Sequence, residues 1–350
     1  VTYVCGRSSA LAALPCLAAI WCWDRAAAQP AGGSPQAYAP ALHALGMLCF
    51  AAALAVKETS AVLPLALWLW QATRPAAAGE PARWNPLHWK RAERRALGGY
   101  VAVAMAALIV ALASPTYRHL LSFSLSTRSV PANLALQSHA WGFLAAELVR
   151  LSALHADPGL TAFATTPLGA CAWAAPWVVL IGTAWALRAR SPALAFGVGW
   201  FVIWLLPTNS LLPRLDPAND RQLYLALIGP AWLAALALAR ACRARPVYGW
   251  VLLALLAALL GSATAQRNRV YRTEISFWQA VLSRSPADAR AANNLGVAYA
   301  LACRDADAAR AFARAIALDP AGYRARINLE FLRDGTLTRR EAGGCRLAAR

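Results

Sequence analysis

The sequence predicts an all-α membrane protein: a polytopic domain of about eight apolar spans, followed by a short domain of paired helices. Of the 350 residues, 59% are hydrophobic and only 14% are charged, whereas ordinary soluble domains carry roughly 25% charged residues. Several windows approach the roughly 20 apolar residues that a helix needs to cross a bilayer core about 30 Å thick. The composition changes after residue 265, where the chain is rich in Arg and Asp and no apolar run is long enough to span.

The apolar segments lie within residues 1–265, which we assign to one membrane domain. The candidate spans are residues 5–23, 41–56, 59–73, 98–114, 170–187, 193–206, 222–239 and 247–263. Several of them are shorter than a full bilayer crossing. The stretch 41–73 has an alternative interpretation as a kinked or re-entrant pair around Lys57 and Glu58, which interrupt its apolar run.

The net charge of +18 comes almost entirely from arginine, and it does not indicate a nucleic-acid-binding protein. No basic face with interleaved aromatic residues is visible. The basic residues cluster instead in the connections 74–97, 188–192 and 240–246, which lie on one side if the spans alternate. The positive-inside rule assigns that side to the cytoplasm. The segments that then lie outside are 115–169, 207–221 and the chain after about residue 264.

Residues 134–160 carry apolar side chains at helical spacing, with His139, Glu147 and Arg150 between them. We expect an interfacial helix on the outer leaflet. The alternative is a ninth span, which inverts the sides of everything that follows and removes the agreement among the charged connections.

Residues 266–335 predict a helical repeat of the tetratricopeptide type. Pro286 and Pro320 are 34 positions apart, as are Trp278 and Phe312, and 34 residues is the period of this repeat. Small residues let paired helices touch, and aromatic residues fill the gap to the next unit. The expected packing residues are Leu295, Gly296, Tyr299, Ala308, Phe312, Ala315 and Pro320, with Ala292 where the pattern usually has tryptophan. We expect this domain to dock a protein or peptide, and residues 336–350 to form a disordered tail.

The eight cysteines show no metal-binding spacing. Cys303 and Cys345 are able to pair in an oxidising compartment, although spacing alone does not establish their proximity. No cluster of ligands appears among the five histidines. The sequence identifies no cofactor and leaves a metal requirement open.

Ionisable residues beside apolar spans mark the candidate site, because charge at that depth usually pairs or faces a cavity. The candidates on the predicted outer side are Arg7, Lys57, Glu58, Asp216, Asp220 and Arg221. The guanidinium of Arg221 suits a lipid phosphate, which it can bind with its planar fork of donors. The alternatives are an interfacial anchor or a pairing with a nearby acid for Arg221, a topological role for Arg7, and a solvated turn at Lys57-Glu58.

Four segments occur in a distinctive order: YVCGRSSALAAL, AVKETSAVLPLALWL, PTNSLLPRLDPANDRQLYLALIG and the repeat tail. In this order they resemble the C-type-fold membrane glycosyltransferases with C-terminal tetratricopeptide repeats. These are the transmembrane and tetratricopeptide-containing O-mannosyltransferases and their bacterial relatives. The resemblance runs from Val1 to about Leu332. It implies transfer of a sugar from a polyprenyl-phosphate donor to a protein hydroxyl on the extracytoplasmic side, with the repeats docking the acceptor polypeptide.

The resemblance also implies roles for individual residues. The Lys-Glu pair of the family matches Lys57 and Glu58. Its acid-Arg-x-Leu-Tyr motif matches residues 220–224, ending at Tyr224, with Asp in place of the commoner Glu and Ala226 where relatives have Pro. The catalytic acid of the family lies in the first outer loop, which we expect to precede Val1. The chain by itself is therefore expected to lack the base and to be inactive.

The implied reaction is an inverting transfer, in which a carboxylate removes the proton of the acceptor while the polyprenyl phosphate departs. The departing group gains negative charge, so fixed cations beside it stabilise the transition state. We expect Arg221 to hold this phosphate, with Lys57 or Arg7 as the second cation. Asp216 and Glu58 are expected to position the acceptor or to orient the cations.

Two other functional classes remain. One is a non-catalytic membrane scaffold whose repeats recruit partners, although eight spans exceed what an anchor needs. The other is a polyprenyl-linked glycan polymerase or ligase. The scarcity of lysine beside abundant Ala and Arg indicates a GC-rich bacterial genome, hence an inner-membrane protein with its repeat domain in the periplasm.

Overall fold

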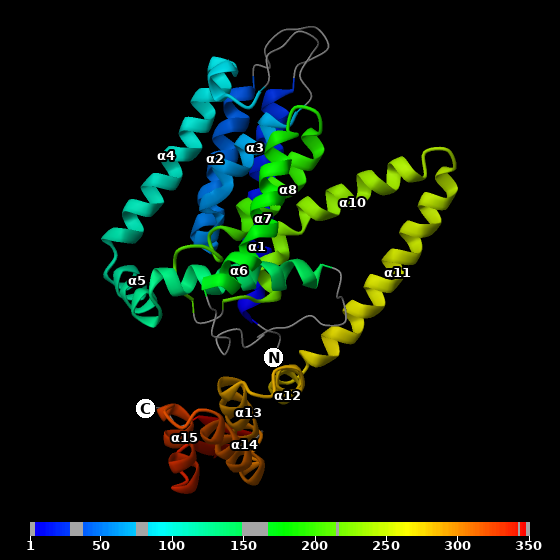
Figure 1. The fold of residues 1–350 in the computed structure, drawn as a ribbon. Coiled ribbons are helices and arrows are strands. Elements are labelled where there is room, and N and C mark those ends of the chain that lie inside the picture. Colours follow the sequence, from blue (N-terminus) through cyan, green and yellow to red (C-terminus); the bar gives the residue numbers. More distant parts are fainter. Residues whose placement is uncertain are drawn as a thin grey trace. The chain divides into compact units, whose positions relative to one another are not determined.

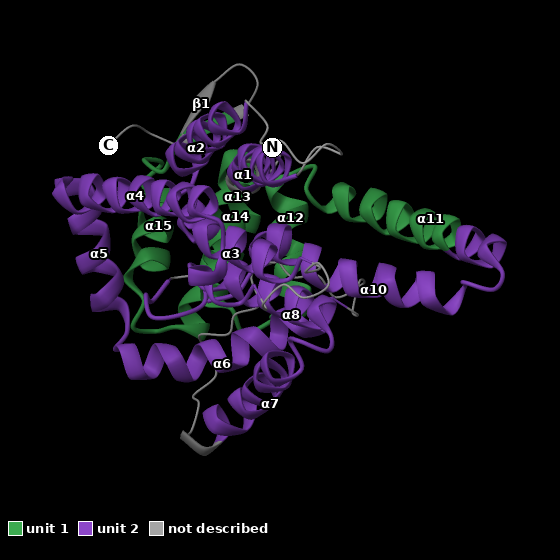
Figure 2. Ribbon diagram, turned by 90° about the horizontal axis from the view of Figure 1, so that it is seen from above, with its two compact units in different colours: residues 1–4, 150–162, 253–350 green, residues 5–149, 163–252 purple. Residues whose placement is uncertain are grey.

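The structure is a computed structural model that describes residues 4–28, 38–74, 83–148, 167–214, 217–341 and 344–347. Helices make up nearly all of it, as the sequence predicts (Figure 1). The chain divides into two compact units (Figure 2). Unit 2 contains the described residues between 5 and 252. Unit 1 contains the described residues from 253 onward, together with Val4.

Six helical stretches in the described residues are long and apolar enough to cross a membrane. They are Ser8–Ala27 of α1 (Val4–Ala27), α2 (Ala39–Val56), α4 (Arg91–Ala113), Gly169–Ala186 of α7 (Pro167–Ala186), Leu223–Ala241 (α9, Leu223–Ala226, with α10, Ile228–Ala241) and α11 (Pro246–Val270). These six correspond to six of the eight expected spans, and they are compatible with an integral membrane protein.

The other two expected spans are helices too short for a full crossing. Residues 193–206 form α8 (Pro192–Leu205), which has 14 residues. Residues 59–73 form a 3-10 turn, η1 (Glu58–Val62), followed by α3 (Leu63–Ala72) of 10 residues. At 1.5 Å per residue, these helices are about 21 and 15 Å long. The expected count of eight spans is therefore reduced to six long helices and two short ones.

The break before η1 is set by Lys57. Its backbone is extended (φ −158°, ψ 121°), so α2 ends at Val56 and a new turn starts at Glu58. Pro64 then stands in the first turn of α3, where a missing N–H costs nothing. The expected interruption at the Lys-Glu pair is thus a real break between two helices.

Two further helices complete this part of the chain: α5 (Pro115–Thr127) and α6 (Val130–Glu147). Helix α6 occupies the start of the expected interfacial helix, and the later part of that prediction lies outside the described residues. It is not among the six span candidates. In Figures 1 and 2, α6 lies across the direction of α1, α2 and α3.

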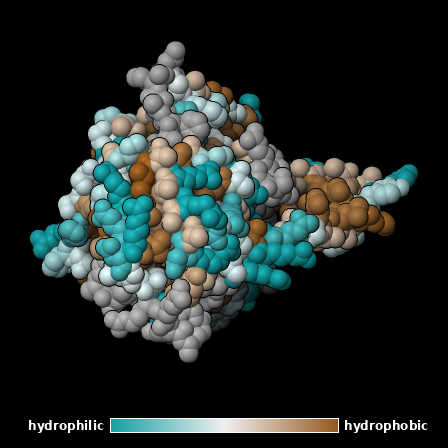
Figure 3. Space-filling view, turned by 90° about the horizontal axis from the view of Figure 1, so that it is seen from below, coloured by the Kyte–Doolittle hydropathy of each residue, from teal (hydrophilic) through white to brown (hydrophobic). Residues whose placement is uncertain are grey.

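Aromatic and small side chains form the core of unit 2. Trp23, Phe50 and Tyr100 are fully buried, and the ring of Tyr100 lies 5.9 Å from each of the other two. Helices α8 and α10 approach each other so closely that a Cβ on Gly229 would lie 2.2 Å from the backbone oxygen of Gly197. Only glycine permits this contact of backbones. Helix α11 is apolar over most of its length and none of its residues is buried, as for a helix surrounded by lipid. Figure 3 shows hydrophobic side chains on one face of the arm that contains α11.

Unit 1 contains four polar-faced helices after α11: α12 (Glu274–Arg284), α13 (Ala289–Leu301), α14 (Asp305–Leu318) and α15 (Tyr323–Arg333). Each packs against the next along the chain. A Cβ on Gly296 would lie 2.5 Å from the ring of Phe312, so a glycine is needed where α13 meets α14. Of the expected packing residues, Leu295, Gly296, Tyr299, Ala308, Phe312 and Ala315 are buried, whereas Pro320 is exposed in a turn.

The end of the chain differs from the expected disordered tail. Strands β1 (Thr338–Glu341) and β2 (Gly344–Leu347) pair in antiparallel register. A disulfide joins Cys345 of β2 to Cys303, in the turn between α13 and α14, with Cα atoms 5.6 Å apart. This is the pair that the sequence analysis considered, and the covalent link holds the segment to the helices.

Candidate functional site

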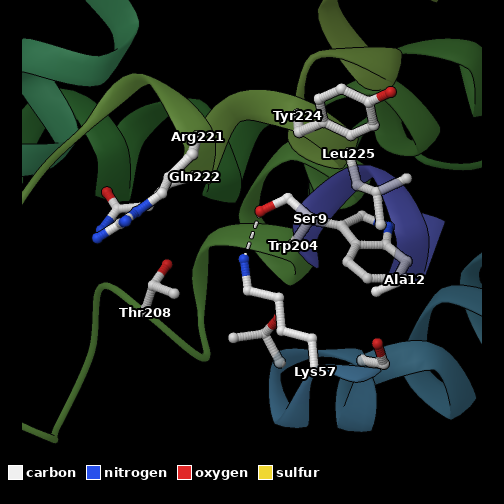
Figure 4. A pocket seen from close by; sticks show the side chains of 11 residues that line it. Ser9, Ala12, Lys57, Trp204, Thr208, Arg221, Gln222, Tyr224 and Leu225 are labelled. Carbon is white, nitrogen blue, oxygen red and sulfur yellow. Dashed lines mark hydrogen bonds between the residues drawn. The ribbon is translucent and has the colours of Figure 1, made fainter. Parts of the chain in front are cut away.

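The sequence-predicted site residues with described side chains gather at one end of unit 2, which we call the Lys57 end. Lys57, Arg221 and Tyr224 line a common small hollow with a volume of about 30 Å³, which is open to solvent (Figure 4). The other lining residues are Ser9, Ala12, Thr59, Ser60, Trp204, Thr208, Gln222 and Leu225. The hollow thus joins α1, the Lys57 break and the segment from α8 to α9.

Lys57 occupies the hollow because the helix stops just before it. Its half-buried side chain points toward α1, and Nζ donates a hydrogen bond to Oγ of Ser9 at 2.5 Å (Figure 4). The two residues are 48 positions apart in the sequence. Ser9 itself is only 6% exposed. The break in the apolar run therefore delivers an amine to a buried hydroxyl of the first helix.

The charges around Lys57 are mostly positive. Burial lowers the pKa of its amine first, and the positive charge of Arg221 lowers it further. Glu58 raises this pKa, and Arg214 lowers it. Two guanidinium groups therefore lie close enough to act on the amine. Like charges gathered in a partly buried place repel one another, and an anion that binds among them relieves this repulsion.

Arg221 and Tyr224 are placed by the short turn before α10. Arg221 lies in η5 (Asp220–Gln222) and is half-buried, while Tyr224 in α9 is 55% exposed. In Figure 4 the phenol of Tyr224 points away from Lys57, so Tyr224 belongs to the rim of the hollow. The turn is fixed to α8 by a hydrogen bond from Nε1 of Trp200 to the backbone oxygen of Leu225 at 2.8 Å.

Of the remaining candidates, Glu58 has a described side chain, and it is not among the residues that line the hollow. Glu58 is exposed at the start of η1 and acts on Lys57 through its charge. Arg7 lies in α1 and Asp220 in η5, but their side chains are outside what the structure describes. Asp216 lies outside the described residues altogether.

Sequence reasoning missed the neutral polar residues that support this end. Nδ2 of Asn209 donates to Oε1 of Gln137 at 2.9 Å and to the backbone oxygen of Pro217 at 2.8 Å. Its Oδ1 accepts from Oγ1 of Thr208 at 2.7 Å. Asn209 is 2% exposed and Gln137 is 3% exposed. In the sequence, Asn209 and Gln137 are single uncharged amides beside apolar residues, so the pattern of charges does not single them out.

Asn133 makes a second link between α6 and the same segment. Its Nδ2 donates to the backbone oxygen of Ser210 at 2.8 Å, and its Oδ1 accepts from Arg128 at 3.1 Å. Asn133 is fully buried. Burial lowers the pKa of Arg128. This arginine, which the sequence analysis did not single out, adds to the positive character of the Lys57 end.

The opposite end of unit 2, which we call the Asp24 end, carries acids with visible partners. The carboxylate of Asp24 accepts from Nε1 of Trp70 at 3.1 Å and forms an ion pair with Arg74 at 3.2 Å. Ser9 and Asp24 lie 15 positions apart on α1, which corresponds to about 22 Å along a helix. The two polar ends are therefore separate sites.

A buried amide and carboxylate pair completes the Asp24 end. Gln71 is fully buried, accepts from Nε1 of Trp23 at 3.3 Å, and donates to Oε1 of Glu93 at 2.9 Å. Oε2 of Glu93 accepts from the backbone N–H of Lys90 at 3.1 Å, as in a capping box at the start of α4. Glu93 thus serves helix capping and packing.

Within the described ranges, no group of three or more His, Cys, Asp or Glu side chains is placed to hold a metal ion. No family model, no curated protein and no solved structure matches the chain. The chemistry of the Lys57 end must therefore be argued from its own residues.

Proposed function

We propose that this protein binds the phosphate of a polyprenyl-phosphate sugar at the Lys57 end and, as a membrane glycosyltransferase-like protein, passes the sugar to a protein hydroxyl on the extracytoplasmic side. The observation that carries the proposal is the convergence of Lys57 and Arg221 on one hollow, with Arg214 acting on the same amine. The sequence resemblance to tetratricopeptide-containing O-mannosyltransferases supplies the sugar chemistry.

A lipid-borne phosphate suits this place better than a free one. The hollow lies where long apolar helices end, which is the depth of lipid headgroups. Leu211 and Leu212, in the segment that leads to Arg214, are 59% and 47% exposed and offer contact to a polyprenyl chain. A guanidinium binds two phosphate oxygens at once, and an ammonium adds a compact point charge.

The same cations would act in the reaction. As the glycosidic bond breaks, the departing phosphate gains negative charge, and fixed positive groups stabilise that charge in the transition state. Ser9 holds the amine of Lys57 in place before the donor arrives. The described lining of the hollow contains no carboxylate. The base that deprotonates the acceptor is therefore expected to be a residue outside the described lining of the hollow.

One observation supports an extracytoplasmic Lys57 end, and another supports an oxidising compartment for unit 1. The Asp24 end lies beside the arginine-rich connection 74–97, which the positive-inside rule places in the cytoplasm. Independently, unit 1 contains the disulfide between Cys303 and Cys345, and disulfides persist in oxidising compartments such as the periplasm. We propose that unit 1 is a short tetratricopeptide domain there, and that it docks the acceptor polypeptide.

The test is equilibrium binding of a labelled polyprenyl-phosphate sugar to the protein in lipid nanodiscs. Arg221→Ala should weaken donor affinity about 10- to 100-fold, because a charge-assisted hydrogen bond contributes about 1.5–3 kcal/mol. Arg190→Ala removes an exposed arginine from the turn between α7 and α8 and is the matched control. Unchanged donor affinity and transfer rate in Arg221→Ala would remove this residue from the site.

The fate of the label separates the alternatives. Membranes that contain the protein and a labelled donor should accumulate sugar on protein. Label found on a lipid-linked glycan instead indicates the polymerase or ligase. A protein that binds no donor and transfers no label is the membrane scaffold.

A further inference from the structure

The segment that carries the arginines of the Lys57 end has little regular structure of its own. Between the end of α8 at Leu205 and the start of η5 at Asp220, the described residues form turns and bends. Its first residues are tied to the end of the helix: Leu206 N–H donates to the oxygen of Val202, and the N–H groups of Thr208 and Asn209 donate to the oxygen of Leu205. Irregular backbone of this kind needs outside contacts to keep one conformation.

Helix α6 provides those contacts through two amide side chains that face the segment. Gln137 accepts from Asn209, which in turn holds the backbone oxygen of Pro217 and the hydroxyl of Thr208. Asn209 thereby links the backbone at Pro217, eight positions later in the segment, to Gln137 on α6.

A second amide stands one helical turn earlier, at Asn133, and holds the backbone oxygen of Ser210. Trp141, one turn later than Gln137, donates from Nε1 to the backbone oxygen of Asn209 at 2.8 Å. These three side chains therefore recur at intervals of four along α6, and all of them bond to the segment. Helix α6 therefore holds the segment through three successive turns of the helix.

We propose that Gln137 and Asn133 are positioning residues, which hold residues 208–214 and 217–222 so that Arg214 and Arg221 stay close enough to act on Lys57. The bonds of both amides are buried, where the exchange of a partner for water is costly. The segment is therefore held in one place before any donor binds. The consequence for donor affinity rests on the proposed function, whereas the positioning itself does not.

The titration of Lys57 reports the position of the arginines directly. The charged groups that act on its amine are Arg221, Arg214 and Glu58. Lys57 and Lys90 are the only lysines in the chain, so mass spectrometry after brief acylation follows both amines in one sample. The midpoint of labelling against pH gives the pKa of Lys57 without any donor, and Lys90, at the Asp24 end, is the internal reference.

Gln137→Leu should raise the labelling midpoint of Lys57, since the arginines are no longer held beside the amine. Below that midpoint, labelling relative to the plateau rate should fall about threefold, because the neutral fraction changes tenfold for each unit of pKa. Ser138→Ala is the matched control, because its hydroxyl bonds only within α6, to Ala135. If Gln137→Leu does not fold, Asn133→Ala tests the same claim.

A double-mutant cycle separates positioning from a general loosening of the fold. In an Arg221→Gln, Arg214→Gln background, Gln137→Leu should cause no further shift of the Lys57 midpoint. An equal shift with and without the arginines, or no shift in either background, would overturn the inference. Donor binding is measured separately. If the midpoint shifts as expected while the wild-type protein binds no donor, the positioning stands and the proposed function fails.

Discussion

The two polar ends of unit 2 are built differently. At the Asp24 end, Asp24 and Glu93 each accept hydrogen bonds from specific partners, so the charges stabilise the fold. At the Lys57 end, a half-buried amine donates a hydrogen bond to a neutral hydroxyl, and Arg221 and Arg214 lower its pKa while Glu58 raises it. The first arrangement is what stability requires. The second disfavours the charged form of the amine, because burial and Arg221 together outweigh Glu58.

This contrast shows why charge near an apolar helix is an ambiguous sign in a sequence. Both ends contain acids, arginines and one lysine, and composition does not tell them apart. The described charges differ in what surrounds them: Asp24 forms an ion pair with Arg74, whereas burial and Arg221 lower the pKa of Lys57 despite the opposite effect of Glu58. Strain of the second kind is typical of functional sites, although structural networks also produce it.

The largest effect should come from breaking the network of the Asp24 end. Gln71→Leu leaves Nε1 of Trp23 and a carboxylate oxygen of Glu93 without their partner in the interior. We expect the free energy of unfolding to fall by about 2–4 kcal/mol, since each unsatisfied buried group costs about 1–3 kcal/mol. Reversible unfolding in mixed micelles measures it. Full stability in Gln71→Leu would show that the two ends do not differ in this way.

The corresponding change at the Lys57 end should affect binding rather than stability. Lys57→Met should weaken the affinity for polyprenyl phosphate about 10- to 30-fold, or about 1.4–2 kcal/mol, and leave the free energy of unfolding unchanged or slightly higher. Lys90→Met, which removes the other lysine, should alter neither quantity. Donor binding and unfolding of both variants provide the comparison. A Lys57→Met protein that unfolds more easily yet binds normally contradicts the assignment.

A smaller effect is expected in the dependence on pH. The pKa of Lys57 in the folded protein lies below its usual value of 10.5. Between the lowered pKa and 10.5 the unfolded chain binds more protons, so stability should rise with pH across that window. Donor affinity should fall over the same window, as the amine loses its charge. Lys57→Arg should remove both trends, and their persistence in this variant would assign them to another group.

The smallest effect should be that of the exposed ion pair. Arg74 and Asp24 are 25% and 38% exposed, and pairs of this kind contribute about 0.2–1 kcal/mol. A double-mutant cycle of Arg74→Ala and Asp24→Asn should therefore give a coupling energy of about 0.5 kcal/mol, which decreases with added salt. A coupling above about 2 kcal/mol would mean that this pair is a buried element of the core.

Much of the fold could be predicted from sequence, because apolar length is a local property. The helices α1, α2, α4 and α11 follow directly from it. The shortness of α3 and α8 was visible in the short apolar runs 59–73 and 193–206, and the interruption at Lys57 and Glu58 is confirmed as the break between α2 and η1. The hairpin of β1 and β2 was missed, because residues 336–350 were expected to be disordered, although the pairing of Cys303 with Cys345 had been considered and the structure contains it.

The charged part of the site was visible in the sequence, whereas its support was not. Lys57 and Arg221 stood out because charge is rare beside apolar runs. Ser9, Asn209 and Gln137 are ordinary polar residues, and their meaning comes from contacts across 48 and 72 positions. Only folding brings such partners together, so no local pattern indicates them.

The most direct test of the central claim is protection of Lys57 by the donor lipid. The protein in nanodiscs is acylated briefly at increasing concentrations of polyprenyl phosphate. Mass spectrometry of one peptide digest then measures the labelling of both Lys57 and Lys90. A lipid phosphate bound at the Lys57 end should slow the acylation of Lys57 about tenfold at saturation, while Lys90 reacts as before. Equal labelling of Lys57 with and without the lipid would contradict the account.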